Sequence, residues 1–281
     1  MTAFNQVKLS TASAELIFPA VPNFSDAYQM LSVTGIGPMP IEVNTTPSTS
    51  PGTVYSGSHA SDRELTLLFR LNPDWKTQET PSQLRSKLYS LLSGGRGNYV
   101  TVTLQSELVE AYTIGYVKTI DVSVYTRNPE AQITILCPNP YFQSTTLDEY
   151  ATVETTRDIE GVTWYEYKTD VDNESAAPSG LRVEAALTPH TDLKFELEST
   201  YSDKLGFVGP PLENAVAEDF TIVTIPGERE IMSSEQGFMI GFMTPVSKWP
   251  MLSSATETVT FRSTTQATGV FVWVRKQWWG F

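Results

Sequence analysis

Few side chains in this sequence are of the types that carry out acid–base or nucleophilic chemistry. Its 281 residues include two histidines, His59 and His190, and one cysteine, Cys137. Each histidine stands in a turn-like segment rich in serine and threonine, where a general base would still need a nucleophile and an orienting group. We therefore expect both to be solvated loop residues. A single cysteine excludes an intrachain disulfide, and with two distant histidines it cannot form a structural zinc site.

Carboxylates are numerous, but the sequence singles out no pair of them. Hydrolysis of a glycosidic bond needs two carboxylates that flank the scissile bond. The candidates for such a pair are Glu64, Glu107, Glu166 and Glu184. The segment Asp170–Glu174 resembles a calcium loop only superficially, because it lacks the central glycine and the terminal glutamate of an EF-hand. We expect a solvated turn there.

Two glycine-rich segments could be taken for phosphate-binding loops. Gly94–Gly97 follows a predicted helix, whereas a phosphate cradle precedes one. Gly206–Pro211 has no lysine at the spacing of a phosphate loop. Since neither segment fits, and since no catalytic constellation stands out, we predict that the protein is not an enzyme. We likewise predict no catalytic residue, no metal site and no cofactor.

Aromatic side chains are the more suggestive group, because exposed rings can stack on sugars or anchor protein interfaces. Trp164 and Tyr167 lie on one predicted strand, and Trp278 lies in the aromatic C-terminus. We take these three as candidate contacts with carbohydrate or with a protein partner. Trp273 lies within the apolar run Val270–Val274, and we expect it to fill a β-sandwich core.

One helix is predicted, at about residues 80–93. Thr80 can cap it, proline follows at the first helical position, and Gln83 completes the spacing of a capping box. Two glycines, Gly94 and Gly95, can end the helix in the left-handed conformation. The apolar stripe of the helix consists of Leu84, Leu88, Leu91 and Leu92.

Alternation of apolar and polar residues with period 2 predicts strands along most of the chain. In the first half the most apolar strand is 63–71, and the series ends where two prolines follow Cys137. From about residue 146, short strands recur at even spacing without a second good helix, which is typical of a β-sandwich. We therefore predict a mainly β protein with two domains, residues 1–145 and residues 146–281.

A long segment between the early strands, Asn44–His59, is dense in Thr, Ser, Pro and Gly and predicts a loop. Loops of this length without structure of their own are uncommon in compact domains. We expect it to be mobile or to pack only on a partner.

The composition excludes several classes of protein. Apolar residues make up 40% and charged residues 18%, which is typical of a folded chain and not of a disordered one. The net charge of −13 repels phosphate backbones, so we expect no specific binding of nucleic acid. The first residues, Met1–Glu15, have no secretory signal pattern, and no run approaches the ~20 apolar residues of a membrane span. We therefore expect synthesis as a soluble protein with no membrane span.

The order of these features resembles the N-terminal "belt" domain of siphophage distal tail proteins. A Ser/Pro/Gly-rich loop precedes a strand of the type Arg-x-Leu-x-Leu, at Arg63–Leu67, and the leucine-patterned helix follows. Further strands end in Cys-Pro-Asn-Pro-Tyr-Phe at Cys137–Phe142. The ending Val274–Phe281 is similar to the aromatic-Gly termini of longer members of that family.

The resemblance implies a structural role. It implies a β-sandwich or split-barrel belt domain at residues 1–145 and a galectin-like β-sandwich at residues 146–281. Six belts would form a ring that joins the tail tube to the tail-tip hub and leaves a channel for the genome. The second domain would support receptor-binding proteins or tail fibres. The protein would be made in the host cytoplasm and reside in the virion, at the tail tip, with Asn44–His59 ordered at a contact between neighbours.

Two other functions are compatible with the sequence. A carbohydrate-binding module would use Trp164, Tyr167 or Trp278 as a stacking surface in recognition of the host, and this could coexist with a ring-forming first domain. A glycoside hydrolase of sandwich fold would use two of the candidate glutamates.

Overall fold

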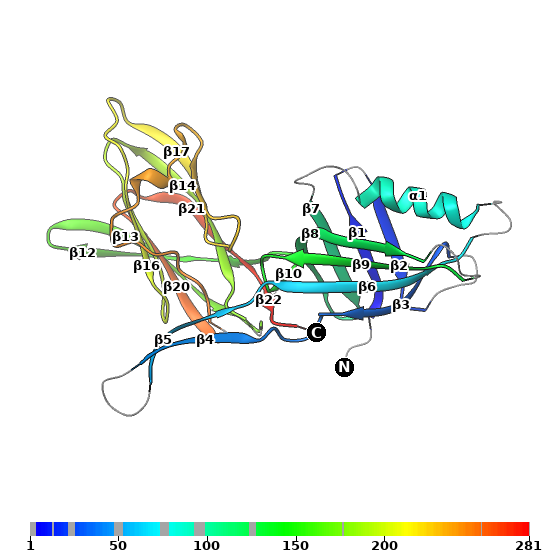
Figure 1. Ribbon diagram of the computed structural model, residues 1–281. Helices are drawn as coiled ribbons and strands as arrows, with labels where there is room; N and C mark the ends of the chain where they lie inside the picture. The colour runs from blue at the N-terminus through cyan, green and yellow to red at the C-terminus, as the bar shows by residue number, and fades with distance from the viewer. Residues whose placement is uncertain are drawn as a thin grey trace. The chain divides into compact units, whose positions relative to one another are not determined.

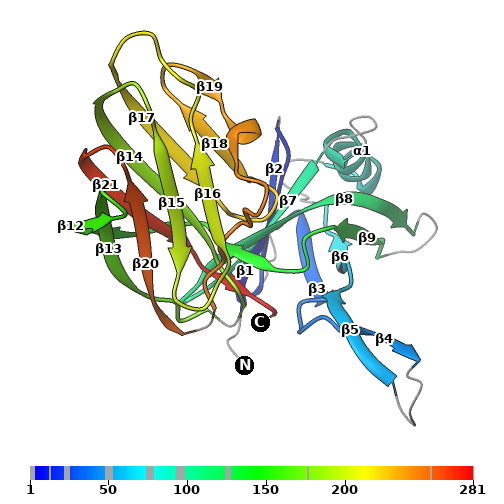
Figure 2. The same ribbon diagram turned by 90° about the vertical axis from the view of Figure 1, so that its left-hand side faces the viewer.

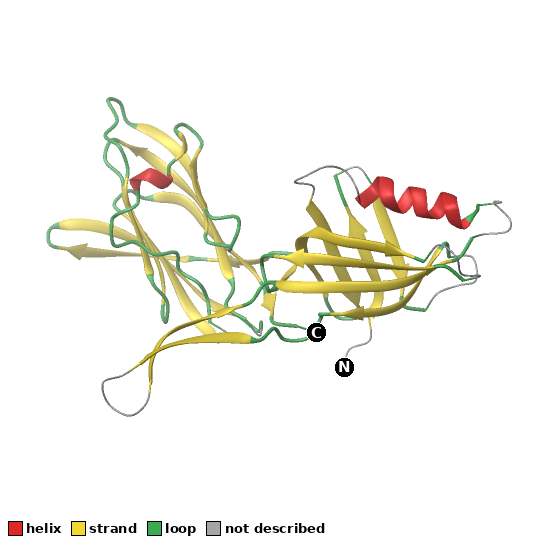
Figure 3. Cartoon of the chain, viewed as in Figure 1, coloured by secondary structure: helices red, strands yellow, loops and turns green. Residues whose placement is uncertain are grey.

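The computed structural model describes residues 4–12, 14–21, 26–47, 53–73, 79–92, 99–123, 128–175, 177–253 and 255–280. Strands dominate these residues (Figures 1 and 3). The chain divides into two compact units: unit 1 comprises Met1–Thr145 with Trp278–Phe281, and unit 2 comprises Thr146–Gln277. Sequence patterns place Trp278–Phe281 in the second domain. In the structure they belong to unit 1, because Trp278 packs against its core.

Unit 1 is built on one antiparallel sheet with the central order β2-β1-β7-β8-β9-β6-β3. The short strand β10 pairs with β8, and β22 pairs with β10. The strands are β1 (Phe4–Ser10), β2 (Glu15–Pro19), β3 (Tyr28–Thr34), β6 (Arg63–Leu71), β7 (Tyr99–Ser106), β8 (Glu110–Val122), β9 (Glu130–Cys137), β10 (Phe142–Ser144) and β22 (Gln277–Trp278). Strand β6 forms at the predicted residues 63–71, and its side chains alternate strictly between buried and less buried.

The sheet of unit 1 curls so that side chains from its two edge strands meet. The ring of Phe18 on β2 lies 6.0 Å from the ring of Tyr28 on β3, and both rings contact Phe69 on β6. A sheet whose ends approach each other encloses its apolar face, which is the geometry of a split barrel. The predicted fold class is therefore confirmed for this unit.

Helix α1 (Pro81–Leu92) packs into the same core through Leu84, Leu88 and Leu92. Its capping box is formed as predicted: the backbone N–H of Thr80 donates to Gln83 Oε1 at 2.7 Å, and the N–H of Gln83 donates back to Thr80 Oγ1 at 3.3 Å. The predicted glycine stop, Gly94 and Gly95, lies outside the described residues. Among those described, no helix is both long and apolar enough to cross a bilayer.

The described parts of the segment predicted to be a loop, 44–47 and 53–59, instead belong to a two-stranded hairpin. Its strands are β4 (Ile41–Pro47) and β5 (Thr53–Ala60), paired with each other and with no other described strand. Turn-forming residues dominate the composition and indicate a loop, yet the threonines, Val43 and Tyr55 have high strand propensity and pair locally. A bulge shifts the register after Asn44, opposite Gly57.

Unit 2 is a β-sandwich of two antiparallel sheets (Figure 2). The six-stranded sheet has the order β11-β21-β14-β17-β18-β19, and the five-stranded sheet has the order β12-β13-β20-β15-β16. The strands are β11 (Asp148–Ala151), β12 (Val153–Ile159), β13 (Val162–Asp172), β14 (Gly180–His190), β15 (Lys194–Ser199), β16 (Lys204–Val208), β17 (Val216–Val223), β18 (Glu230–Ser233), β19 (Gly237–Phe238), β20 (Thr256–Ser263) and β21 (Ala267–Arg275). Side chains from both sheets form one apolar core.

Candidate functional site: the β4–β5 hairpin and its base

Three of the sequence pieces that carry the resemblance meet at one side chain of unit 1. Arg63 begins β6 directly after the hairpin, and it is fully buried. Around its guanidinium lie the turn that leads into β4, the end of the Cys137–Phe142 segment, and the C-terminal strand end. We call this cluster the Arg63 junction. Its members are Gly35, Gly37, Arg63, Pro140, Phe142 and Trp279.

The guanidinium of Arg63 donates four hydrogen bonds, all to backbone carbonyls. Nε donates to Pro140 at 2.7 Å and Nη1 donates to Gly37 at 2.9 Å. A second bond from Nη1 reaches the carbonyl of Gly35, and Nη2 donates to the carbonyl of Trp279. The planar fork of an arginine can satisfy carbonyls from several segments at once, which an ammonium cannot do in the same geometry.

The buried charge of Arg63 is balanced without a carboxylate among the described residues. Burial lowers its pKa from 12.5 to about 10, so the side chain remains a cation at neutral pH. The guanidinium carbon lies 4.4 Å from the centre of the Phe142 ring, a cation–π contact. Four carbonyl dipoles and one ring face therefore take the place of a counter-ion.

Two glycines allow the segments of the junction to approach each other. A Cβ at Gly280 would meet the backbone of Gly37 and Pro38, and a Cβ at Gly35 would meet the backbone of Glu64. Gly35 also has a φ of 83°, which other residues rarely adopt. The ring of Trp279 lies 4.8 Å from that of Tyr141 and closes this side of the cluster. The junction therefore holds both ends of the hairpin and the C-terminal residues in one arrangement.

The hairpin itself is amphipathic. Alternation and register place Ile41, Val43 and Tyr55 on one face of the ribbon, together with Thr45 and Ala60. The first three are 53%, 59% and 62% exposed, although each is a large apolar or aromatic side chain. An isolated two-stranded ribbon is marginally stable in water. The uncovered apolar face is therefore suited to a contact with another protein surface.

The opposite face of the hairpin is polar. His59 Nε2 lies 3.3 Å from Glu42 Oε2, and Ser61 Oγ donates to Glu42 Oε1 at 3.1 Å. These groups are exposed, so the ion pair contributes little to stability. His59 was expected in a loop, and the structure places it in strand β5, with no nucleophile in the contacts that it makes.

The predicted aromatic contacts have three different environments. Trp164 lies on the outer face of β13 and is half-buried. Tyr167 is in the unit 2 core, where its hydroxyl donates to the carbonyl of Ala267 at 3.2 Å and accepts from the N–H of the same residue. The prediction that the ring of Tyr167 contacts a sugar or a partner is therefore wrong, because the side chain is buried. Trp278 is half-buried and packs against the core of unit 1.

Trp273 is also placed differently from the prediction. The side chains of Val270, Val272 and Val274 enter the unit 2 core, so Phe271 and Trp273 point to the outer face of β21. The guanidinium of Arg182 lies 6.0 Å from the Trp273 ring. Because both faces of this strand carry apolar residues, its sequence does not reveal which side chains face outward.

The candidate catalytic groups do not assemble into a site. Glu64 forms an ion pair with Lys118 in unit 1, whereas Glu166 and Glu184 belong to unit 2 and lie on different sheets. Glu166 is buried, and its pKa is lowered because Lys168 and Arg262 outweigh the effect of burial, which by itself raises it.

Two further expectations from the sequence are wrong in detail. His190 is buried at the end of β14, not solvated, with Nδ1 3.0 Å from the carbonyl of Thr188 and Nε2 3.7 Å from Glu218 Oε2. The first residues of Asp170–Glu174 complete strand β13 and do not form a separate turn. In the described parts of the chain, no three metal-ligating side chains are grouped to hold an ion.

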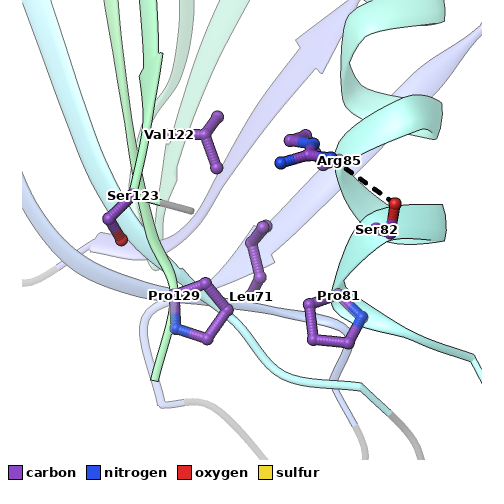
Figure 4. A pocket seen from close by; sticks show the side chains of 7 residues that line it. All are labelled: Leu71, Pro81, Ser82, Arg85, Val122, Ser123 and Pro129. Carbon is purple, nitrogen blue, oxygen red and sulfur yellow. Dashed lines mark hydrogen bonds between the residues drawn. The ribbon is translucent and has the colours of Figure 1, made fainter. Parts of the chain in front are cut away.

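A hollow of about 250 Å³ lies beside the N-terminus of α1 (Figure 4). It is lined by Leu71, Pro81, Ser82, Arg85, Val122, Ser123 and Pro129. Among these described lining residues only Arg85 is charged, and its exposed guanidinium makes a long hydrogen bond of 3.5 Å to Ser82. The capping box already uses the N–H of Gln83 at this helix end. We assign no chemistry to this hollow.

The fold of this chain is that of a solved phage tail protein. Among solved structures, the chain is similar to the Dit protein (gp 19.1) of phage SPP1, described as a paradigm of the hub adsorption apparatus in phages that infect Gram-positive bacteria. The TM-score is 0.62 at 14% identity, over 96% of this chain and 98% of that chain.

A chain of the phage P2 baseplate, in its activated conformation with calcium, is similar at a TM-score of 0.51 and 9% identity, over 96% of this chain and 97% of that chain. No family model and no curated protein matches the sequence. The resemblance inferred from the sequence is thus confirmed at the level of the fold.

Proposed function

We propose that this protein is a structural component of a phage tail tip, where six copies form a ring between the tail tube and the tail-tip hub. The observation that carries this proposal is the β4–β5 hairpin, whose apolar face is uncovered in a chain that shares its fold, over 96% of its length, with the Dit protein of phage SPP1. Virion location and a non-enzymatic role follow from the same assignment.

A closed ring needs a heterologous contact, in which one surface of each copy meets a different surface of the next. The hairpin is a surface of this kind, because it extends beyond the sheet of unit 1 (Figure 1) and pairs with no other described strand. We infer that its face formed by Ile41, Val43 and Tyr55 packs on the neighbouring copy. The Arg63 junction then sets the direction in which the hairpin leaves the sheet.

The charge of the protein supports passage of DNA without binding. A net charge of −13 disfavours adhesion of a phosphate backbone to the subunit. In the proposed ring the genome passes through a central channel, and unit 2 supports receptor-binding proteins or tail fibres. A galectin-like identity for unit 2 remains part of the proposal.

The proposal is tested by the mass of the full chain in solution, measured by light scattering, with negative-stain images of the same peak. We expect a particle of six times 31.2 kDa with an open centre, either alone or after addition of the tail-tube protein of the same phage. A monomer under both conditions contradicts the proposal.

A further inference from the structure

The outer face of the six-stranded sheet in unit 2 exposes aromatic rings. On β21, Phe271 is 43% exposed and Trp273 is half-buried, and their ring centres are 5.8 Å apart at an angle of 39°. The valines between and beside them fill the core. Solvated sheet faces are normally polar, so two neighbouring rings on such a face indicate a surface that contacts something other than water.

Charged hydrogen-bonding groups stand beside these rings on the next strand. Register places Arg182 opposite Trp273 and Glu184 opposite Phe271. Arg182 Nε donates to Glu184 Oε1 at 2.9 Å, and Nη2 donates to the same oxygen. Among the described residues, Arg182 Nη1 and Glu184 Oε2 make no hydrogen bond. The pair therefore offers one donor group and one acceptor beside the rings.

The surface around these groups is hollowed on both sides. One hollow, of about 420 Å³, is lined by Glu184, Ala185, Ala186, Asp219, Phe220, Thr221, Thr268, Gly269 and Phe271. The other, of about 300 Å³, is lined by Leu147, Arg182, Val223, Ile225, Glu228, Glu230 and Arg275. Pockets that hold small ligands begin at about 300 Å³ and combine apolar walls with a few placed polar groups. Gly269 has no side chain to cover the edge of the Phe271 ring.

The charges exclude an anionic ligand. Arg182 is paired with Glu184, and Arg275 is paired with Glu228. The carboxylates of Asp219 and Glu230 have no basic partner among the described residues, so the two hollows together carry an excess of negative charge. Phosphates, sulfates and acidic sugars would be repelled.

The backbone beneath the rings also argues against a peptide strand as the ligand. A peptide that adds to a sheet uses a free strand edge, but β21 is paired with β11 and β14, and β14 is paired with β17 and β21. What remains is a pair of neighbouring aromatic rings next to side-chain donors and acceptors. A neutral sugar ring matches it, because its C–H face can stack on aromatic rings while its hydroxyls both donate and accept hydrogen bonds.

We propose that this face, centred on Phe271, Trp273, Arg182 and Glu184, binds an uncharged saccharide. The site rests on unit 2 alone and is independent of ring formation. The outer face of the five-stranded sheet, which carries Trp164, is less suited. There Arg262 forms ion pairs with three glutamates, Glu166, Glu196 and Glu198, so its hydrogen-bonding capacity is already used.

The test is a titration of the full chain with neutral disaccharides, in which saturation-transfer NMR detects binding. The disaccharides are lactose, maltose, cellobiose and diacetylchitobiose. We expect saturable binding of at least one of them, and no binding of the anionic sugar 3′-sialyllactose. Phe271→Ala should weaken the interaction about tenfold or more, since stacking is lost, and Glu184→Gln should weaken it as well. Phe271 is partly exposed and outside the core, so the melting temperature should change little.

Trp164→Phe, on the other sheet, is the matched control and should leave the affinity unchanged. The proposal is overturned if no neutral disaccharide binds at tens of millimolar, if Phe271→Ala binds like the unmodified protein, or if sialyllactose binds as well as the neutral sugars. Ring formation is measured on the same sample by light scattering, so failure of the saccharide site and failure of the proposed ring are separate outcomes.

Discussion

Arg63 is a buried cation whose partners are carbonyl groups and a ring. Removing the guanidinium would leave four partly buried carbonyls of the Arg63 junction without this donor. Unsatisfied buried polar groups each cost about 1–3 kcal/mol, partly offset here because the cost of burying the charge also disappears. The side chain therefore acts as a structural cross-link.

We predict that Arg63→Met lowers the stability of unit 1 by about 3–5 kcal/mol. Arg63→Lys should also destabilise it, because an ammonium cannot reproduce the fork. The measurement is differential scanning calorimetry of the full chain, in which the unit 1 transition should move to lower temperature. Arg70→Met is the control on the same strand: Arg70 is partly exposed and paired with Glu130, so its loss should cost about 1 kcal/mol or less. Equal effects of Arg63→Met and Arg70→Met would contradict the assigned role.

Cys137 is a buried thiol next to this junction, and burial raises its pKa from 9.0 to about 11. The folded state therefore keeps a proton that the unfolded state releases above pH 9. The stability that the thiol contributes is complete below pH 9 and is lost as the pH rises to about 11. Two pH units correspond to about 2–3 kcal/mol.

We predict that Cys137→Ala lowers stability by a constant amount below pH 9 and that the difference from the unmodified protein shrinks between pH 9 and 11. Thermal unfolding of both proteins across this range measures the difference. A difference that stays constant to pH 11 would show that the thiol does not titrate in this way. Comparing two proteins cancels the alkaline effects of the other groups.

At the scale of elements, the hairpin of β4 and β5 is the part of the chain that least resembles an independent structure. It has two strands, one apolar face and no second layer among the described residues. Ribbons of this kind are stable when something covers the apolar face. In the proposed ring, the cover is a neighbouring copy of the same chain.

We predict that Val43→Asp prevents ring formation, because it places a charge in the centre of the apolar face. Val43 is 59% exposed in the subunit, so the melting temperature of the monomer should change by only a few degrees. Glu42→Gln, one residue away on the polar face, should leave the ring intact. Light scattering measures the particle mass of the unmodified protein, Val43→Asp and Glu42→Gln. A ring that persists in Val43→Asp would show that the hairpin does not make the contact.

At the scale of the whole molecule, the chain passes between the two units twice, once near residue 145 and again at Gln277. Unit 2 is thus an insertion between the body of unit 1 and its last residues. The last residues of the chain make specific contacts in unit 1. The carbonyl of Trp279 is one of the four that Arg63 binds, and Gly280 packs on the Gly37 backbone. The C-terminus therefore completes the base of the hairpin.

Much of the secondary structure follows from local sequence. The capping residues and leucine spacing of α1 predict a helix at 80–93, and it forms at Pro81–Leu92. The apolar run at 63–71 predicts a strand, and β6 forms at Arg63–Leu71. These signals are local because side chains of one helix turn or one strand face sort themselves by period alone. The turn-forming composition of Asn44–His59 predicts a loop, but the threonines and the tyrosine of this segment favour strands and pair in β4 and β5.

What the sequence by itself determined is the mainly β class, the helix, the exclusion of an intrachain disulfide, and an order of motifs that resembles distal tail proteins. Only the tertiary structure decided which of these motifs touch. Arg63, Pro140 and Trp279 are far apart along the chain, and their contact depends on sheet order and on the C-terminal return. The structure likewise decided that Tyr167 is buried while Trp273 faces outward, since the face a strand turns to the core depends on the sheet packed against it.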